Sequence, residues 1–139
     1  MEGLPYHAVR GIIFRHMMTV SMLSVMLANI RGEDAELTAI AGLLHDIYTL
    51  EALETHGHAA QGAVMAEHIL GKLQLTTAKE TMSIVDAIRI HSKKSKRYDS
   101  FAEVLVDADV LAHYIEGPRL LPEKDKERME ALKKELSIG

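Results

Sequence analysis

The chain has 139 residues, 47% of them hydrophobic and 26% charged, with a formal net charge of −4 and no cysteine. This length suits one domain with a sizeable core, and the composition is ordinary for a soluble globular protein. The acidic balance argues against general nucleic-acid binding, which requires a basic excess. The absence of cysteine excludes disulfides and thiolate ligands, so any bound metal would be held by imidazole and carboxylate.

Proline is found at positions 5, 118 and 122 alone, so the residues between 5 and 118 contain no obligate helix breaker. We therefore predict an all-α fold of five to six helices, arranged as a single compact domain over residues 1–139. The segment from Met17 to Ile30 is apolar, but it is too short for a membrane span and contains serine, threonine and asparagine. A buried helix is the better interpretation, and we expect a cytoplasmic protein that does not bind a membrane.

The first predicted helix runs from about Val9 to Arg31. Its apolar positions alternate by four and three residues, which is the period of one helix face, and His16 occupies one of these core positions. Gly32 ends this helix, and Asp34 has the character of an N-cap for the next one.

The second predicted helix carries an apolar stripe up to Leu44 and then reaches His45 and Asp46. Adjacent residues on a helix point about 100° apart, so both side chains can face one ion only near a helix end or over a wide inward face. A short helical or irregular link from Tyr48 to His56 follows, and Gly57 ends it.

The third and fourth predicted helices, at about 58–73 and 77–91, each carry a histidine in line with apolar residues. His58 begins the third helix and His91 ends the fourth. Gly62 lies one turn after His58, where it would let another backbone approach closely.

The fifth predicted helix, at about 100–116, places Asp109 on the same face as Leu105, so this carboxylate points inward. Asp107 is the rival carboxylate, but it lies about 200° away around the helix and should not reach the same ion. A last, charged amphipathic helix is predicted over residues 122–136. Its apolar stripe consists of Met129, Leu132 and Leu136.

Six polar groups thus fall in apolar stripes of several predicted helices, where an unpaired polar group would be costly. They are His16, His45, Asp46, His58, His91 and Asp109. Each one alone is more often a hydrogen-bonded structural residue. Their joint presence favours a shared metal site.

The order of these six residues resembles that of the HD-domain metal-dependent phosphohydrolases. The segment AGLLHDI is close to the family signature, HMMTV resembles its first-histidine motif, HAAQG matches its next His-to-Gly spacing, and VDADVL matches its late carboxylate motif. The resemblance covers about residues 9–116 and favours Asp109 over Asp107. It implies that His16, His45, Asp46 and Asp109 ligate one divalent metal, and that His58 and His91 hold a second ion with Asp46 bridging.

The resemblance implies a metal-dependent phosphohydrolase, in which a metal-activated water hydrolyses a phosphoester or phosphoanhydride of a nucleotide or similar small phosphate. Nitrogen and oxygen ligands suit Fe, Mn, Zn, Co or Ni, with one or two ions per chain. Asp46 would accept the proton of the water. His58 and His91 would bind the second metal, or act as acid or electrostatic groups without it. The sequence leaves open whether the substrate is a phosphomonoester, a phosphodiester or a pyrophosphate.

A polar basic loop follows directly after His91. It contains Lys93, Lys94, Lys96 and Arg97. One interpretation is a solvated loop, and the other is that one or two of these cations contact substrate phosphates at the rim of the site. Many HD-domain proteins have Gly-Lys after the HDI signature, and that lysine can contact phosphate, whereas Tyr48 and Thr49 stand here. This departure leaves open whether catalysis is weak or absent.

Two alternatives keep the same fold. In the first, the domain binds metal and nucleotide without catalysis, as a sensor or as an assembly module that docks through its C-terminal helix. In the second, it is a di-iron oxygenase. A homo-oligomer is compatible with each of these hypotheses. The remaining histidines are interpreted as surface or packing residues, with His56 nearest the expected mouth of the site. They are His7, His56, His68 and His113.

Overall fold

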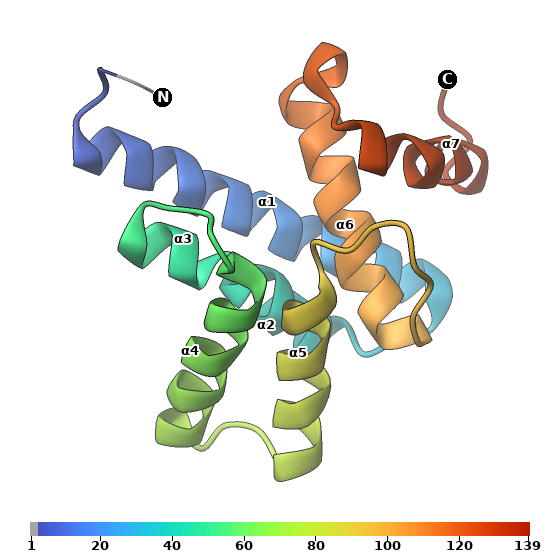
Figure 1. Ribbon diagram of the computed structural model, residues 1–139. Coiled ribbons are helices and arrows are strands. Elements are labelled where there is room, and N and C mark those ends of the chain that lie inside the picture. Colours follow the sequence, from blue (N-terminus) through green and yellow to red (C-terminus); the bar gives the residue numbers. More distant parts are fainter. Residues whose placement is uncertain (1–2) are drawn as a thin grey trace.

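The structure is a computed structural model and describes residues 3–139. These residues form α-helices, two single-turn 3-10 helices and connecting turns, so the predicted all-α fold is confirmed (Figure 1). The elements are α1 (Tyr6–Arg31), α2 (Ala35–Leu44), α3 (Ile47–Ala52), α4 (His58–Leu73), α5 (Ala78–Ile90), α6 (Ser100–Glu116), η1 (Pro118–Leu120), η2 (Glu123–Asp125) and α7 (Lys126–Glu135). The predicted link after Asp46 contains the short helix α3.

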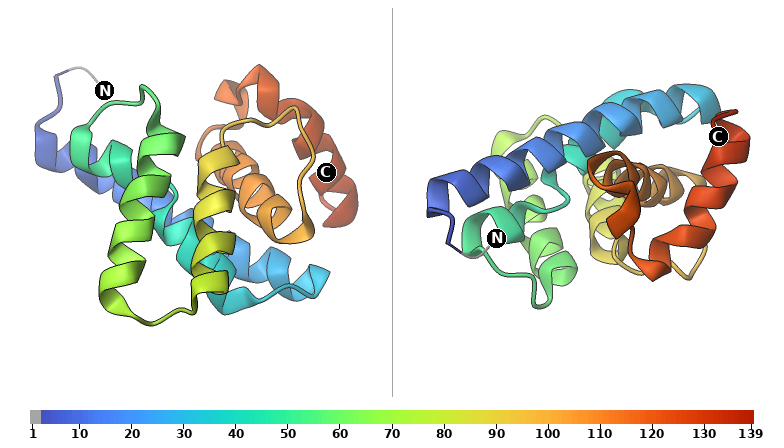
Figure 2. Two further views of the ribbon diagram at one scale, coloured as in Figure 1. Left: turned by 60° about the horizontal axis from the view of Figure 1, so that its bottom comes forward. Right: turned by 90° about the horizontal axis from the view of Figure 1, so that it is seen from above.

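Helix α1 is the longest element and runs along one side of the molecule (Figures 1 and 2). Its inward face buries residues such as Met17, Val20 and Leu27. It ends at Gly32, whose φ of 76° lets its N–H bond the Ala28 carbonyl oxygen. By length and composition α1 also qualifies as a membrane-crossing helix, and 39% of its most apolar window is buried. Core helices of soluble proteins and signal sequences share these properties.

Helices α1 and α2 approach closely because α2 carries a glycine at their contact. A Cβ atom on Gly42 would lie 2.7 Å from the Cα atom of Ser21, a distance that real Cβ atoms essentially never show. The Ser21 hydroxyl also donates to the Ala39 carbonyl oxygen at 2.8 Å. This contact brings the end of α2, and with it His45, beside His16 of α1.

Helix α6 is the central helix of the fold. Its residues 104–112 are all buried, and α1, α2, α5 and α7 all contact it. Helices α4 and α5 form an antiparallel pair on one side (Figure 1). Helix α5 begins with a capping box, in which the Thr77 side chain accepts from the Glu80 N–H and the Glu80 side chain accepts from the Thr77 N–H.

The predicted C-terminal helix forms α7, and its apolar stripe faces the core of the chain itself. Met129 and Leu132 are each 1% exposed and belong to the hydrophobic cluster around α6. On the same helix Arg128 is 2% exposed and donates to the carboxylates of Glu103 and Asp107 on α6. The stripe that the sequence offered as a docking face for assembly is therefore used inside the domain.

Candidate metal centre

Four of the predicted residues meet at one point between α1, α2 and α6. His16 comes from the middle of α1, His45 and Asp46 from the turn after α2, and Asp109 from the buried stretch of α6. The Asp109 Oδ1 lies 3.0 Å from the His16 Nε2 and 3.3 Å from the His45 Nε2. The Asp46 Oδ2 lies 3.5 Å and 3.3 Å from the same two nitrogens. As the sequence required, His45 and Asp46 share this point because α2 ends just before them.

The other two predicted histidines face the second oxygen of Asp46. The Asp46 Oδ1 lies 3.4 Å from the Nε2 of His91, which follows α5, and 3.9 Å from the Nε2 of His58, which begins α4. The structure thus brings all six predicted residues together, with Asp46 between two groups of imidazoles. Asp107 lies outside the cluster and binds Arg31 and Arg128 instead.

Every one of these four histidines turns its Nε2 toward the carboxylates because its Nδ1 is bound on the other side. His45 and His91 each donate from Nδ1 to the carbonyl oxygen three residues earlier, at 2.6 Å, and the backbone N–H of the same histidine also donates to that oxygen. His58 does the same to Thr55 at 3.0 Å. On His16, Nδ1 lies 2.9 Å from both carboxylate oxygens of Glu116. With the proton on Nδ1, each neutral imidazole presents its lone pair at Nε2.

This arrangement favours a positive charge among the four side chains. The Nε2 atoms of His16 and His45 lie only 3.3 Å apart, and two facing lone pairs repel each other unless a positive charge lies near them. Imidazole nitrogens and carboxylate oxygens are the donors that suit divalent transition metals. The residues present therefore fit a metal ion, and two triads have ligand atoms close enough to hold one. These triads are His16, His45 and Asp109, and His45, Asp46 and His91.

The pKa values of Asp46, Asp109 and His45 also indicate that positive charge is favoured in the cluster. Burial disfavours ionisation of Asp46, but His45 outweighs this and holds the pKa of the carboxyl well below its usual range. Burial likewise opposes ionisation of Asp109, yet Lys94 and His16 keep its pKa well below that range. Burial also disfavours the charged form of His45, but the two carboxylates raise its pKa to about 10. In the metal-free chain a proton on His45 thus supplies charge that a metal ion would supply.

Lys94 is the largest departure from the sequence interpretation. The sequence placed it in a solvated loop or at the rim, whereas its side chain is 1% exposed. Its ammonium donates to the Asp109 Oδ2 at 2.6 Å and to the His91 carbonyl oxygen at 2.5 Å. The loop is turned inward because Arg128 of α7 binds the carbonyl oxygens of Lys94 and Lys96. That anchor is distant in the sequence, so local pattern could not reveal it.

The other three loop cations stay outside the cluster. Lys96 and Arg97 are exposed, and Arg97 forms an ion pair with Glu127 at 3.4 Å. Lys93 is exposed and lines a neighbouring cavity together with Arg89. Of the exposed cations of this loop, Lys93 is therefore the one that lies beside the site, where it could contact a substrate phosphate at the rim.

His113, which the sequence analysis interpreted as a surface or packing residue, contacts the cluster, as does Glu116, which it did not name. The His113 Nδ1 lies 2.6 Å from the buried Asp125, and its Nε2 lies 3.5 Å from the Asp109 Oδ1. The His113 ring stacks on that of His16, with centroids 5.2 Å apart. The sequence did contain a signal for both residues. Positions 109, 113 and 116 follow the four-three period of one helix face, so His113 and Glu116 lie on the same face as Asp109. His7, His56 and His68 are exposed, as expected for surface residues.

A cavity of about 240 Å³ opens beside the cluster. Four of the six predicted ligands line it, and Lys94, Lys124, Thr49 and His113 also lie in its wall. The four ligands are Asp46, His58, His91 and Asp109. The Thr49 hydroxyl is buried and has no hydrogen-bond partner among the residues described. A neighbouring cavity of about 410 Å³ shares His58 with the first. The wall of this hollow therefore carries two ammonium groups and the carboxylates of Asp46 and Asp109.

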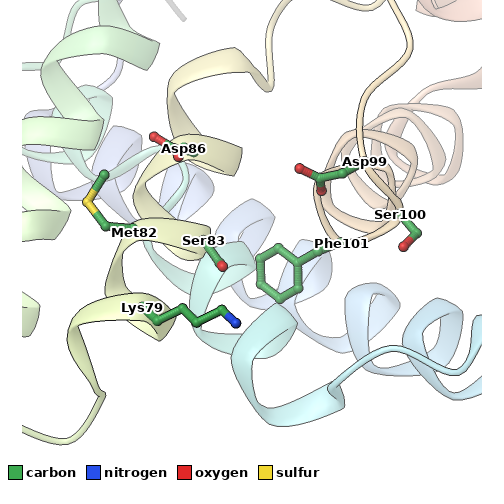
Figure 3. Close-up of a pocket in the computed structure, with 7 residues that line it drawn as sticks. All are labelled: Lys79, Met82, Ser83, Asp86, Asp99, Ser100 and Phe101. Atoms are coloured by element: carbon green, nitrogen blue, oxygen red, sulfur yellow. The ribbon is translucent and has the colours of Figure 1, made fainter.

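A separate pocket of about 340 Å³ lies between α5 and the start of α6 (Figure 3). It shares no residue with the histidine cluster. Its carboxylates have structural partners, since Asp86 pairs with Arg89 at 2.5 Å and Asp99 accepts from the Ala102 N–H as the N-cap of α6. These groups are satisfied by the fold itself.

Comparison with known proteins agrees with this geometry. The family model of the HD domain matches residues 13–129. The chain is 31% identical to ribonuclease Y of Bacillus subtilis over 108 residues, covering 77% of this chain and 19% of that protein. It is 34% identical to ribonuclease Y of Lawsonia intracellularis over 123 residues, covering 86% of this chain and 22% of that protein. The chain thus spans about a fifth of the length of these curated relatives.

No solved structure matches the chain in the structural comparison. The family match covers most of the chain and includes all six residues of the cluster. The chain belongs to the HD domain family of metal-dependent phosphohydrolases.

Proposed function

We propose that this HD domain hydrolyses a phosphoester or phosphoanhydride of a nucleotide or similar small phosphate, with a divalent metal held by His16, His45, Asp46 and Asp109. The observation that carries the proposal is the pair of Nε2 atoms of His16 and His45, 3.3 Å apart and both fixed by Nδ1 hydrogen bonds. Such a pair is stable beside a cation and costly without one.

The metal contributes chemistry that no side chain of the site provides. When bound, a divalent ion acts as a Lewis acid that polarises a phosphoryl oxygen and lowers the pKa of water. Glu116 and the carbonyl oxygen of Gly42 hold the imidazoles of His16 and His45 in the orientation that leaves Nε2 free. Hydrogen bonds of this kind fix the tautomer of a ligating histidine and raise its basicity.

The residues around the cavity supply the remaining functions. The Asp46 Oδ1 faces His58 and His91, whereas the Oδ2 faces His16 and His45, and we assign to Oδ1 the proton of an attacking water. Burial lowers the pKa of His91, which favours its neutral form as a ligand or proton acceptor. The buried Thr49 hydroxyl is free to donate to a phosphoryl oxygen.

The charge and size of the cavity favour a small anionic substrate. The exposed Lys124 places an ammonium group in the wall of a hollow of about 240 Å³, where the buried Lys94 ammonium is paired with Asp109. Phosphate oxygens are suitable partners for such groups, because charge-assisted hydrogen bonds are stronger than neutral ones. The adjoining cavity of about 410 Å³, with Arg89 and Lys93, offers room for the rest of a nucleotide.

The relatives favour a second candidate, a phosphodiester of RNA. Their name is ribonuclease Y, and the similarity extends over 77% and 86% of this chain. The net charge of −4 gives this chain no general attraction to a polyanion, so RNA binding would depend on local cations such as Lys93 and Lys124. We therefore place the small phosphate first and RNA second.

The test is a panel of nucleotides, phosphorylated small molecules and short RNA oligonucleotides, each assayed with Mn, Fe, Co, Ni and Zn. We expect turnover of at least one phosphorylated compound, abolished in Asp46→Ala. Lys126→Ala is the matched control, because Lys126 pairs with Glu123 at 2.7 Å and lies outside the cavity wall. Metal binding without turnover of any compound would instead favour a non-catalytic sensor.

A further inference from the structure

The buried ammonium of Lys94 lies inside the metal centre of this chain. We propose that Lys94 acts as a built-in cation of the centre, so that the site binds one divalent ion tightly and accepts a second only together with an anion. The inference rests on the metal site of the proposed function but on none of its substrates.

The first argument is the division of the two oxygens of Asp109. The Oδ2 accepts a hydrogen bond from the Lys94 ammonium at 2.6 Å, while the Oδ1 faces His16 at 3.0 Å and His45 at 3.3 Å. Asp109 therefore has one oxygen directed at the ion position and one already satisfied by a positive charge. An ammonium has no lone pair when charged, so it takes no part in ligation.

The second argument is that Lys94 is held in place from several sides. Its ammonium donates to the His91 carbonyl oxygen at 2.5 Å, and its own carbonyl oxygen accepts from the Arg128 Nε at 2.8 Å. Arg128 is in turn fixed by the carboxylates of Glu103 and Asp107 on α6. A side chain with 1% exposure and these anchors cannot turn out to water without breaking several buried hydrogen bonds.

The third argument is the charge of the centre. Among the groups that face the ion positions directly, Asp46 and Asp109 contribute two negative charges and Lys94 contributes one positive charge. The ligating histidines are neutral when they bind metal. Glu116 and Asp125 lie behind the imidazoles of His16 and His113 and are not counted. One divalent ion therefore leaves the centre with a single net positive charge. A second divalent ion at His58, His91 and Asp46 would raise this to three positive charges in a largely buried site, which is unfavourable.

A bound anion would lower the net positive charge of a centre that holds two ions. A phosphate dianion in the cavity would reduce the net charge of a two-ion centre from three to one. The positions of His58 and His91, with Nε2 atoms 3.9 Å and 3.4 Å from the Asp46 Oδ1, then become available to a second ion. Occupancy of the second position would thus follow phosphate binding.

The experiment is a calorimetric titration of the metal-free protein with Mn²⁺, with and without inorganic phosphate. Without phosphate we expect about one ion per chain, with any second ion bound roughly tenfold or more weakly. With phosphate we expect a second ion to bind. Two ions of equal affinity without phosphate, or one ion under both conditions, would overturn the proposal.

Two variants test the lysine itself. Lys94→Met removes the charge and should strengthen binding of the second ion by about tenfold or more without phosphate. Lys94→Arg keeps the charge and should behave like the wild type, and circular dichroism reports whether each variant is folded. A folded Lys94→Met protein with wild-type stoichiometry and affinities would contradict the proposal. If this variant does not fold, the phosphate-dependent titration of the wild type decides.

These readouts need no substrate turnover, so the inference and the proposed function fail separately. A chain that binds one ion alone and a second with phosphate, but hydrolyses no phosphorylated compound, would support the role of Lys94 and refute the phosphohydrolase. A chain that hydrolyses phosphate esters and binds two ions with equal affinity in the absence of phosphate would support the phosphohydrolase and refute the role of Lys94.

Discussion

The Nε2 atoms of His16 and His45 lie 3.3 Å apart, while the Nδ1 of His16 is bound to Glu116 and the Nδ1 of His45 to the Gly42 carbonyl oxygen. These two histidines are separated by 28 residues of sequence and come from different helices. Their convergence on the buried Asp109 is the core of the metal centre. The following expectations depend on it.

Glu116 orients His16, so its amide variant should weaken metal binding. Both Glu116 oxygens lie 2.9 Å from the His16 Nδ1, and an amide cannot supply the same charge. Outer hydrogen bonds of this kind are worth about 10- to 100-fold in metal affinity. We expect Glu116→Gln to lose affinity within this range in competition with a chelating dye. Glu67→Gln, an exposed change on α4, is the control. Equal affinities of Glu116→Gln and the wild type would show that Glu116 has no such role.

The pH dependence of stability should differ between metal-free and metal-loaded protein. Burial lowers the pKa of His45, but Asp46 and Asp109 outweigh it and raise the folded-state pKa to about 10. A raised folded-state pKa stabilises the protein fully below the unfolded value of 6.5, and this stability is lost as the pH rises toward about 10. The Tm of the EDTA-treated protein should therefore fall between about pH 7 and about pH 10.

Metal has the opposite dependence, because it binds the neutral imidazole and displaces the proton. The difference in Tm between metal-loaded and metal-free protein should grow with pH over the same range, as scanning calorimetry would show. A difference that stays constant would mean that no proton is displaced from the cluster.

The helices and the six clustered residues could be predicted from the sequence because both depend on local signals. The four-three period identified the buried face of α1, and the HDI signature located His45 and Asp46 beside the end of α2. Helix geometry indicated that Asp107 and Asp109 should not reach the same ion, and the family resemblance favoured Asp109.

The burial of Lys94 could not be predicted, because it depends on a contact with a distant helix. Arg128 lies 34 residues away and holds the Lys94 carbonyl oxygen from α7. The sequence after His91 contains several cationic residues, and no local pattern distinguishes Lys94, whose side chain is buried, from the others. The partnership of His113 with Asp125 is similar, since η2 gives no local sign that it packs against α6.

Gly42 should be intolerant of a side chain. An added Cβ would lie 2.7 Å from the Ser21 Cα, so α1 and α2 would have to separate. Overpacking of this kind costs about 1–3 kcal/mol, and we expect Gly42→Ala to lower the free energy of unfolding in urea by that amount. Gly71→Ala on α4 is the matched control, because nothing lies within 4 Å of its added Cβ. Its helix propensity should instead raise stability by up to about 1 kcal/mol. Equal effects of the two changes would refute the close α1–α2 contact.

Lys124 should contribute to substrate binding rather than to the fold. It is exposed, its ammonium lies 3.2 Å from the Ser92 carbonyl oxygen, and it lines the cavity beside the cluster. Loss of one hydrogen bond to a charged phosphate costs about tenfold or more in affinity. We expect Lys124→Ala to raise the KM for a phosphorylated substrate by about this factor while the Tm stays unchanged. An unaltered KM would place the phosphate elsewhere in the cavity.

The most direct test of the metal centre is elemental analysis of the protein purified without oxygen, expressed as moles of metal per chain. We expect about one tightly bound divalent ion in the wild type and none in Asp46→Ala, because this variant loses the carboxylate that faces both groups of histidines. A wild-type chain that holds no metal, even after reconstitution with Fe, Mn, Zn, Co or Ni, would contradict the proposed centre.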